Sequence, residues 1–266
     1  MSGRIRHALF DFDGTLSLLR AGWQEVMETY FCEILTATAP TTPRSEHTDN
    51  CRELITRLTG RQTIYQAMEL EQQVRATGTT PLPAARYKAE FQHRLHRRID
   101  HRLLEPCASA ASPRPDTWSP VPSSCCAAST RWVSPATWQA APIFPMSLRR
   151  RSFSGCPVFF TADEGHGRIH GALREHANFS KRLVIERIVA QNGLSGPELV
   201  AFGDGFVEIE ETRRAGGVAV GIASREDGGT GCDPWKARRL QDVGAHLLVS
   251  DWLQSDLLLR TLGITA

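Results

Sequence analysis

Hydrophobic and polar positions along the chain predict two regions of different character. A short apolar run at residues 8–12 predicts a buried strand, whereas residues 20–105 follow the period of amphipathic helices. Pro-, Thr- and Gly-rich stretches interrupt that helical period. We therefore predict an all-helical insert directly after the first strand, with helices at Trp23–Leu35, Cys51–Leu58, Thr63–Arg75 and Ala84–Leu104.

From residue 179 onward, helical and apolar stretches alternate. We predict helices at Phe179–Asn192, where Ser180 is a candidate N-cap, at Glu208–Arg214 and at Pro234–Val243, and strands at Leu199–Phe202, Val218–Ala223 and Ala245–Ser250. Alternation of strands and helices is typical of an α/β domain with a parallel sheet. We predict a Rossmann-like parallel sheet core made of residues 1–18 and 106–266, with residues 19–105 inserted as a separate helical domain.

The segment at residues 106–160 departs from this pattern. Its first 40 residues, 106–145, hold eight of the 15 prolines and three of the 6 tryptophans, with no glycine and no predicted strand or helix. Reading the coding sequence one nucleotide later would turn Trp118, Trp132 and Trp138 into glycines, and would permit a helix and a buried strand over Ser109–Ser123. A frameshift and a genuine Pro/Ser-rich, disordered insert both explain the segment, and both stay open.

Composition narrows the class of protein. A hydrophobic content of 41% suffices for a core, and a net charge of +2 gives no argument for nucleic acid or a membrane surface as a partner. No apolar stretch approaches the ~20 residues that span a bilayer. The 7 cysteines lack zinc-type spacing and suit a reducing compartment. We expect a cytoplasmic protein, and its oligomeric state stays open.

Two acidic motifs carry the candidate chemistry. Asp11 and Asp13 end the first strand, on the same side of an extended chain. Carboxylates this close repel unless a cation or a shared proton intervenes, although an Asx-type turn that caps a helix would also explain the pattern. A second strand ends in Gly203-Asp204-Gly205. Because ligands collect at the carboxyl ends of parallel strands, both acidic motifs are expected at one edge of the sheet.

The sequence resembles the haloacid dehalogenase superfamily, close to its phosphoglycolate phosphatase-like group with a helical cap. The motifs that carry the resemblance are DFDGT at residues 11–15, a lysine at the head of a helix in NFSKRLVIERI, and GDGFVE at residues 203–208, in the family's order. The helical insert falls where that family has its cap domain. The resemblance covers residues 5–105 and 167–255.

The resemblance implies a Mg²⁺-dependent phosphatase that hydrolyses a small phosphorylated metabolite through an aspartyl-phosphate intermediate. Asp11 would be the nucleophile, Asp13 the general acid and base, and Lys181 the cation that neutralises the phosphate. Gly14 and Thr15 would donate backbone N–H groups to the phosphate. The implied Mg²⁺ ligands are the Asp11 carboxylate, the Asp13 carbonyl, Asp204 and Glu208.

Several alternatives stay open at this stage. Lys181 could face solvent, and Glu208 could belong to a solvated acidic helix start. The Ser or Thr of the family's second motif would fall in the aberrant segment, where Thr161 is a possible substitute, and the shifted reading frame does not restore it. A phosphosugar mutase on the same scaffold, or an inactive remnant with a binding role, are the competing functions.

Overall fold

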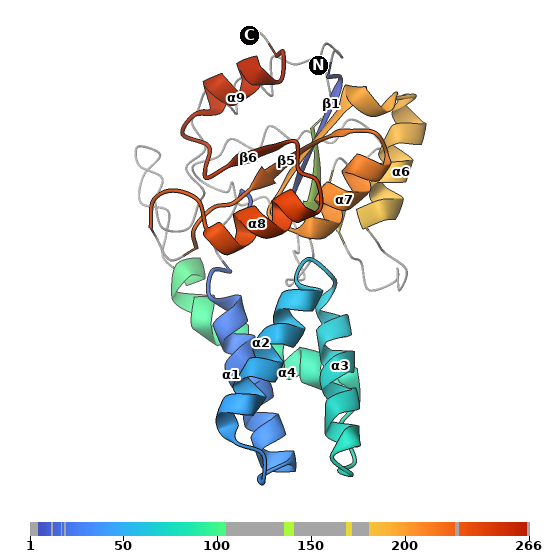
Figure 1. Cartoon of the computed structure of the whole chain (residues 1–266). Helices are drawn as coiled ribbons and strands as arrows, with labels where there is room; N and C mark the ends of the chain where they lie inside the picture. The colour runs from blue at the N-terminus through green and yellow to red at the C-terminus, as the bar shows by residue number, and fades with distance from the viewer. Residues whose placement is uncertain are drawn as a thin grey trace. The chain divides into compact units, whose positions relative to one another are not determined.

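The computed structural model describes residues 5–11, 13–16, 18, 20–104, 136–140, 169–171, 181–226 and 229–264. The chain divides into two compact units, each described by itself (Figure 1). One unit joins Met1–Leu19 to Pro106–Ala266, and the other is the continuous stretch Arg20–Glu105. The division into a core and a cap, with its boundaries at 18–19 and 105–106, stays a prediction, because most of residues 106–160 lie outside the described part of the chain.

The first unit is built on a parallel sheet whose six strands have the order β3-β2-β1-β4-β5-β6. Its central strand β1 pairs with β2 on one side and with β4 on the other, so successive crossovers run in opposite directions from β1. In such sheets the crevice at that reversal point lies outside the carboxyl ends of the strands. The strands are β1 His7–Asp11, β2 Ala136–Ala140, β3 Ile169–Gly171, β4 Leu199–Gly203, β5 Val218–Ile222 and β6 Leu247–Val249.

Helices cover both faces of this sheet, as the alternation of side chains along β4 requires. Leu199 and Ala201 pack against buried residues of α6, whereas Val200 and Phe202 pack on the opposite face with Trp252 and buried residues of α9. A third cluster joins α7 and α8 to the first of these faces. These helices are α6 Lys181–Asn192, α7 Phe206–Arg214, α8 Pro234–Asp242 and α9 Ser255–Thr261, and the 3-10 turn η1 spans Gly196–Glu198.

Aromatic packing holds β1 and β4 together on the α9 face. The rings of Phe10 and Phe202 stack with centroids 4.8 Å apart, and Trp252 contacts both. Phe10 and Phe202 are also paired in the sheet register, which places Asp11 level with the end of β4. The predicted α/β class is therefore confirmed, with β4 buried on both faces as expected for a parallel sheet.

The second unit consists of four helices, three of which begin where the sequence predicts. They are α1 Trp23–Thr38, α2 Arg44–Leu58, α3 Thr63–Ala76 and α4 Ala84–Leu104. The helix α2 begins one and a half to two turns earlier than predicted, because the polar stretch before Cys51 still buries one side chain, His47, whose Nε2 lies 3.1 Å from the Ala39 carbonyl. None of the helices that the structure describes is both long and apolar enough to cross a membrane.

Four short elements were not predicted, one of them the 3-10 turn η1. The strand β2 lies inside the segment at 106–160, to which the sequence assigned no element, and β3 and α9 also lack a sequence signal of their own. Each spans at most seven residues, too few for a period to emerge.

Candidate active site

The nucleophile predicted from the sequence, Asp11, is the last residue of β1. Its Oδ1 atom lies 3.2 Å from the Nζ atom of Lys181, and its side chain is 13% exposed. Burial raises the pKa of the Asp11 carboxyl well above its usual range, and Lys181 counteracts that rise. The charges of other site carboxylates, Asp13 among them, raise it further, so Asp13, which is half-buried, acts on Asp11 electrostatically.

The second acidic motif meets the first at the end of the neighbouring strand. Asp204 follows β4, and Glu208 lies in the first turn of α7, where its Oε1 atom accepts a hydrogen bond of 2.6 Å from the backbone N–H of Gly205. One oxygen each from Asp11, Asp204 and Glu208 lies within 4.8 Å of the others. Carboxylate oxygens are the donors that Mg²⁺ prefers, so this group could hold such an ion.

Lys181 connects the two motifs from the head of α6. Besides its contact with Asp11, its Nζ atom donates a hydrogen bond of 2.6 Å to Oε2 of Glu208. Burial alone would lower the pKa of Lys181, but Asp11 and Glu208 outweigh burial and raise it. Lys181 is 17% exposed, so it is a paired cation within the site rather than a solvent-facing residue.

Gly14 and Thr15 form the turn that brings the two motifs together. Gly14 has a φ of +81°, and a Cβ atom there would overlap the Asp204 carboxylate. The Thr15 hydroxyl accepts a hydrogen bond of 3.1 Å from the backbone N–H of Asp204 and lies 3.4 Å from its Oδ1 atom. Among the described residues, no backbone carbonyl accepts a hydrogen bond from the N–H of Gly14 or Thr15.

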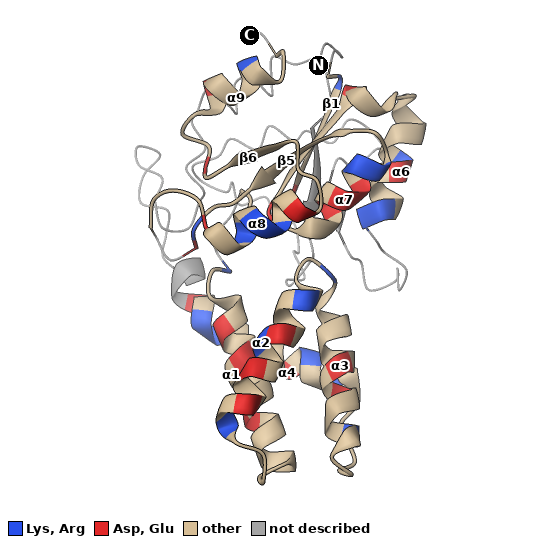
Figure 2. Cartoon of the chain, in the orientation of Figure 1, with Lys and Arg blue, Asp and Glu red and all other residues tan. Residues whose placement is uncertain are grey.

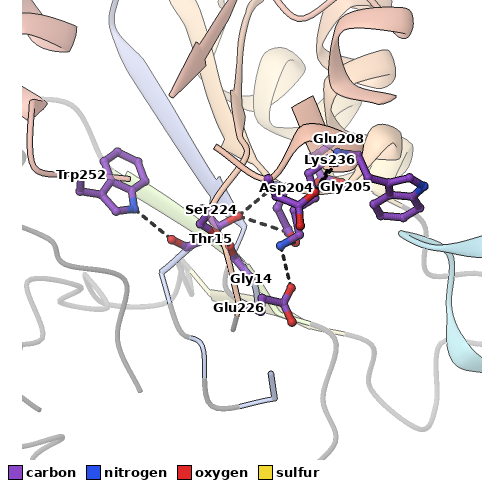
Figure 3. A network of polar contacts seen from close by, with 11 residues as sticks. Gly14, Thr15, Asp204, Gly205, Glu208, Ser224, Glu226, Lys236 and Trp252 are labelled. Atoms are coloured by element: carbon purple, nitrogen blue, oxygen red, sulfur yellow. Dashed lines mark hydrogen bonds and ion pairs between the residues drawn. The ribbon is translucent and has the colours of Figure 1, made fainter. Parts of the chain in front are cut away.

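Four further residues of the site were missed by sequence reasoning (Figure 3). Ser224 donates a hydrogen bond of 2.9 Å to the Gly14 carbonyl, and the indole of Trp252 donates one of 2.9 Å to the Thr15 carbonyl. Both hydrogen bonds are buried, and they fix the backbone of the turn. The other two residues are Lys236, at the start of α8, and Glu226, in the loop after β5.

Lys236 pairs with two carboxylates inside the site. Its Nζ atom lies 3.2 Å from Oδ2 of Asp204 and 2.6 Å from Oε1 of Glu226, and its side chain is 6% exposed. Burial raises the pKa of Asp204 to about 6, although Lys236 acts in the opposite direction. The scarcity of lysine is the sequence signal that could have pointed to Lys236. Only three of the 31 basic residues are lysines, and the other two are Lys88 and Lys181.

Charges of opposite sign alternate around this edge of the sheet. Lys181 contacts Asp11 and Glu208, and Lys236 contacts Asp204 and Glu226. Figure 2 shows both acidic and basic residues on the neighbouring helices α6 and α7. The site therefore collects carboxylates in its centre with cations beside them, an arrangement that suits an anionic group bound together with a metal ion.

Two sequence-based candidates lie outside the described residues. They are Thr161, the possible substitute for the second-motif residue, and Ser180, the candidate N-cap of α6. The described residues do include β2, whose residue Gln139 pairs with Asp11 in the sheet register. The strand β2 is thus paired with β1, and Thr161 as the second-motif residue stays a prediction.

No protein-family model matches the sequence, and neither does any curated protein. Solved structures do match it. A haloacid dehalogenase-like protein of unknown function from Agrobacterium tumefaciens superposes with a TM-score of 0.58 at 18% identity, over 97% of this chain and 99% of the other.

Two further structures carry more specific names. A putative β-phosphoglucomutase from Bacteroides vulgatus has a TM-score of 0.58 at 13% identity, over 98% of this chain and 89% of the other. A protein described as a predicted phosphoglycolate phosphatase from Haemophilus somnus has a TM-score of 0.54 at 14% identity, over 98% and 100%.

The chain has the α/β fold of the haloacid dehalogenase superfamily. The resemblance inferred from the motifs at residues 11–15, 181 and 203–208 is thereby confirmed at the level of the fold. Structural matches at identities of 13–18% show a shared fold only, so the activity has to be inferred from the residues of the site.

Proposed function

We propose that the protein is a Mg²⁺-dependent phosphatase that hydrolyses a small phosphomonoester through an aspartyl-phosphate intermediate. The observation that carries this proposal is the meeting of Asp11, Asp204 and Glu208 within 4.8 Å, with Lys181 in contact with Asp11 and Glu208. A carboxylate nucleophile beside a buried cation and a cluster of oxygen donors is suited to phosphoryl transfer.

The carboxylates fit a hard divalent cation. Asp11, Asp204 and Glu208, together with the backbone carbonyl of Asp13, would hold Mg²⁺, which would supply positive charge to the transferring phosphoryl group. Glu208 already binds Gly205 and Lys181, so part of its role is to fix the loop that presents Asp204.

The first step transfers the phosphoryl group to the protein. A carboxylate oxygen of Asp11 attacks phosphorus while the bond from phosphorus to the ester oxygen breaks. Asp13 gives its proton to the leaving oxygen, which departs as an alcohol. Lys181, whose Nζ atom lies 3.2 Å from Asp11, and the backbone N–H groups of Gly14 and Thr15 would bind the phosphoryl oxygens.

The second step restores the carboxylate. Asp13 takes a proton from water, the water oxygen attacks phosphorus, and the bond from phosphorus to Asp11 breaks. Inorganic phosphate leaves, and Asp13 is again protonated for the next turnover. Because Asp11 must be ionised to attack, Lys181 counters the rise in pKa that burial causes.

Release of p-nitrophenol from p-nitrophenyl phosphate tests the proposal. We expect turnover that requires Mg²⁺ and that Asp11→Asn abolishes, because the amide is not a nucleophile. Asp242→Asn, the same substitution at an exposed residue of α8, is the matched control and should retain wild-type activity. Folded wild-type protein without Mg²⁺-dependent turnover would contradict the proposal and favour an inactive protein with a binding role.

A mutase is the second candidate, because one matching structure is named a putative β-phosphoglucomutase. Such an enzyme would return the phosphoryl group from Asp11 to a second hydroxyl of the substrate instead of to water. Incubation with hexose phosphates, followed by analysis of free phosphate against isomeric sugar phosphates, separates the two reactions.

A cytoplasmic location stays a prediction from the sequence.

A further inference from the structure

Lys236 is a buried cation that the proposed reaction does not use. It lies in the first turn of α8, where Asp233 caps the helix and accepts hydrogen bonds of 2.9 Å from the backbone N–H groups of Trp235 and Lys236. The backbone of Lys236 is thus fixed by the cap, and its side chain reaches Asp204 and Glu226.

The position is unfavourable for a lysine by itself. A positive charge in the first turn of a helix opposes the helix dipole, and burial removes the ammonium group from water. The two carboxylates compensate for this cost only while Lys236 stays between them. The same contacts therefore restrain Asp204 and Glu226 as firmly as they restrain Lys236.

Asp204 is held on both of its carboxylate oxygens. Oδ2 contacts Lys236 at 3.2 Å, and Oδ1 lies 3.4 Å from the Thr15 hydroxyl. The backbone of Asp204 is tied to the same hydroxyl. With the torsion of its side chain set in this way, Asp204 presents its carboxylate toward Asp11 and Glu208 before any ligand binds.

We propose that Lys236 is a positioning residue of the metal site, which orients Asp204 for binding a divalent cation while Glu226 offsets the lysine charge. The proposal rests on the proposed function in one respect, namely that Asp11, Asp204 and Glu208 bind a metal ion. It adds an ion pair to that site, formed by α8 and the loop after β5.

Glu226 determines whether removal of Lys236 weakens or strengthens binding of the metal ion. A bare ammonium group beside a metal ligand would repel the metal ion, and removing it would then strengthen binding. Lys236 is closer to Glu226, at 2.6 Å, than to Asp204, at 3.2 Å, so its charge is largely offset where the metal would bind. Orientation of Asp204 is then the larger effect, and removing Lys236 weakens binding.

Titration calorimetry with Mn²⁺ on the full-length, metal-free protein tests this inference directly. We expect Lys236→Met to weaken Mn²⁺ binding by about tenfold or more, as substitutions of residues that orient metal ligands commonly do. Lys88→Met is the matched control, since Lys88 is the one lysine of the chain outside the site and belongs to the other compact unit, and it should bind Mn²⁺ like the wild type.

A double variant guards against loss of folding. Lys236→Met alone leaves Glu226, whose side chain is 14% exposed, without its cation, which destabilises the protein. Lys236→Met combined with Glu226→Leu removes both charges and should fold, while Mn²⁺ binding stays about tenfold weaker than in the wild type. Binding that is equal to the wild type or tighter in the folded double variant would overturn the inference, because a purely repulsive or structural lysine gives that result.

Kinetics supply a second readout that separates this inference from the proposed function. In the folded double variant, the Mg²⁺ concentration for half-maximal hydrolysis of p-nitrophenyl phosphate should rise about tenfold while KM for the ester stays unchanged. If the wild type binds Mn²⁺, the variants weaken that binding and no form shows turnover, the proposed phosphatase is wrong and the role of Lys236 stands. Wild-type protein that binds no Mn²⁺ overturns the role of Lys236.

Discussion

Position 14 requires glycine for two reasons, namely its backbone conformation and the proximity of Asp204. Its φ of +81° lies in the left-handed region, and the space that a side chain would need is filled by the Asp204 carboxylate. The turn after β1 and the turn after β4 therefore approach more closely than any other residue would permit. This approach brings Asp204 within reach of Asp11.

The first prediction separates the effect of backbone strain at position 14 from the effect of overlap with the Asp204 carboxylate. Gly14→Ala should abolish Mg²⁺-dependent hydrolysis of p-nitrophenyl phosphate, because the new methyl group displaces Asp204. Gly78→Ala is the matched control, since Gly78 has a φ of +82° but nothing within 4 Å of the position of a Cβ atom. Both variants carry the backbone strain of about 1–2 kcal/mol that a left-handed alanine costs.

Urea unfolding and activity assays measure both consequences. Gly78→Ala should lower the free energy of unfolding by about 1–2 kcal/mol and keep wild-type activity at low denaturant. Equal activity in folded Gly14→Ala and Gly78→Ala would show that the approach of Gly14 to Asp204 does not matter for catalysis.

At the scale of elements, α1 and α2 bury two thiols of the helical unit between them. Cys32 and Cys51 are both buried, and Cys32 Sγ lies 3.6 Å from the Thr48 hydroxyl. Burial raises the pKa of the Cys51 thiol to about 12, with smaller contributions from Cys32 and Glu28. Both thiols are free.

The second prediction concerns the reactivity of Cys51. Only a thiolate alkylates readily, so native protein treated with iodoacetamide at pH 8 should be labelled at the exposed Cys232 and not at Cys51. Because the thiol titrates near 9.0 when unfolded and near 12 when folded, its contribution to stability is complete below pH 9.0 and is lost as the pH rises toward 12.

Mass spectrometry of peptides checks this after digestion of the labelled protein. Cys51 should become labelled at pH 8 once urea has unfolded the chain, which controls for the intrinsic reactivity of its peptide. Labelling of Cys51 in native protein at the rate of Cys232 would contradict the packing of α1 against α2.

Elements with a clear period could be predicted from the sequence, and the short ones could not. The helix α3 begins at the predicted residue because its apolar positions recur along one face, and β4 is a continuous apolar run. By contrast, β2 with the sequence ATWQA gains its identity from backbone pairing with β1. That pairing depends on the rest of the sheet, and no local pattern contains it.

At the scale of the whole molecule, the site residues that were predicted stand in local sequence motifs, whereas those that were missed depend on contacts between distant parts of the chain. Asp11, Lys181 and Asp204 stand in recognisable motifs. Ser224 and Trp252 act through single hydrogen bonds to residues more than 200 positions away in the chain. Contacts of that kind follow from the register of β1, β4 and β5, which the sequence does not show.

The two compact units differ in how the chain builds them. The helical unit is one continuous stretch, Arg20–Glu105, and it has a buried apolar core of its own, whereas the sheet unit is assembled from two separated parts of the chain. A contiguous segment with its own core is the usual requirement for independent folding. The core of the helical unit includes Met27, Phe31, Leu54, Leu70, Leu95 and Ile99.

The third prediction is that residues 20–105 fold when they are expressed alone. Circular dichroism should show a helical spectrum that is lost in one cooperative thermal transition. Leu95→Ala in this fragment should lower the free energy of unfolding by about 2–5 kcal/mol, because Leu95 is fully buried. Leu82→Ala, the same substitution at a side chain that is 54% exposed, should change it by less than about 0.5 kcal/mol. A gradual, non-cooperative transition, or equal effects of the two substitutions, would show that the helical unit depends on the sheet unit for its structure.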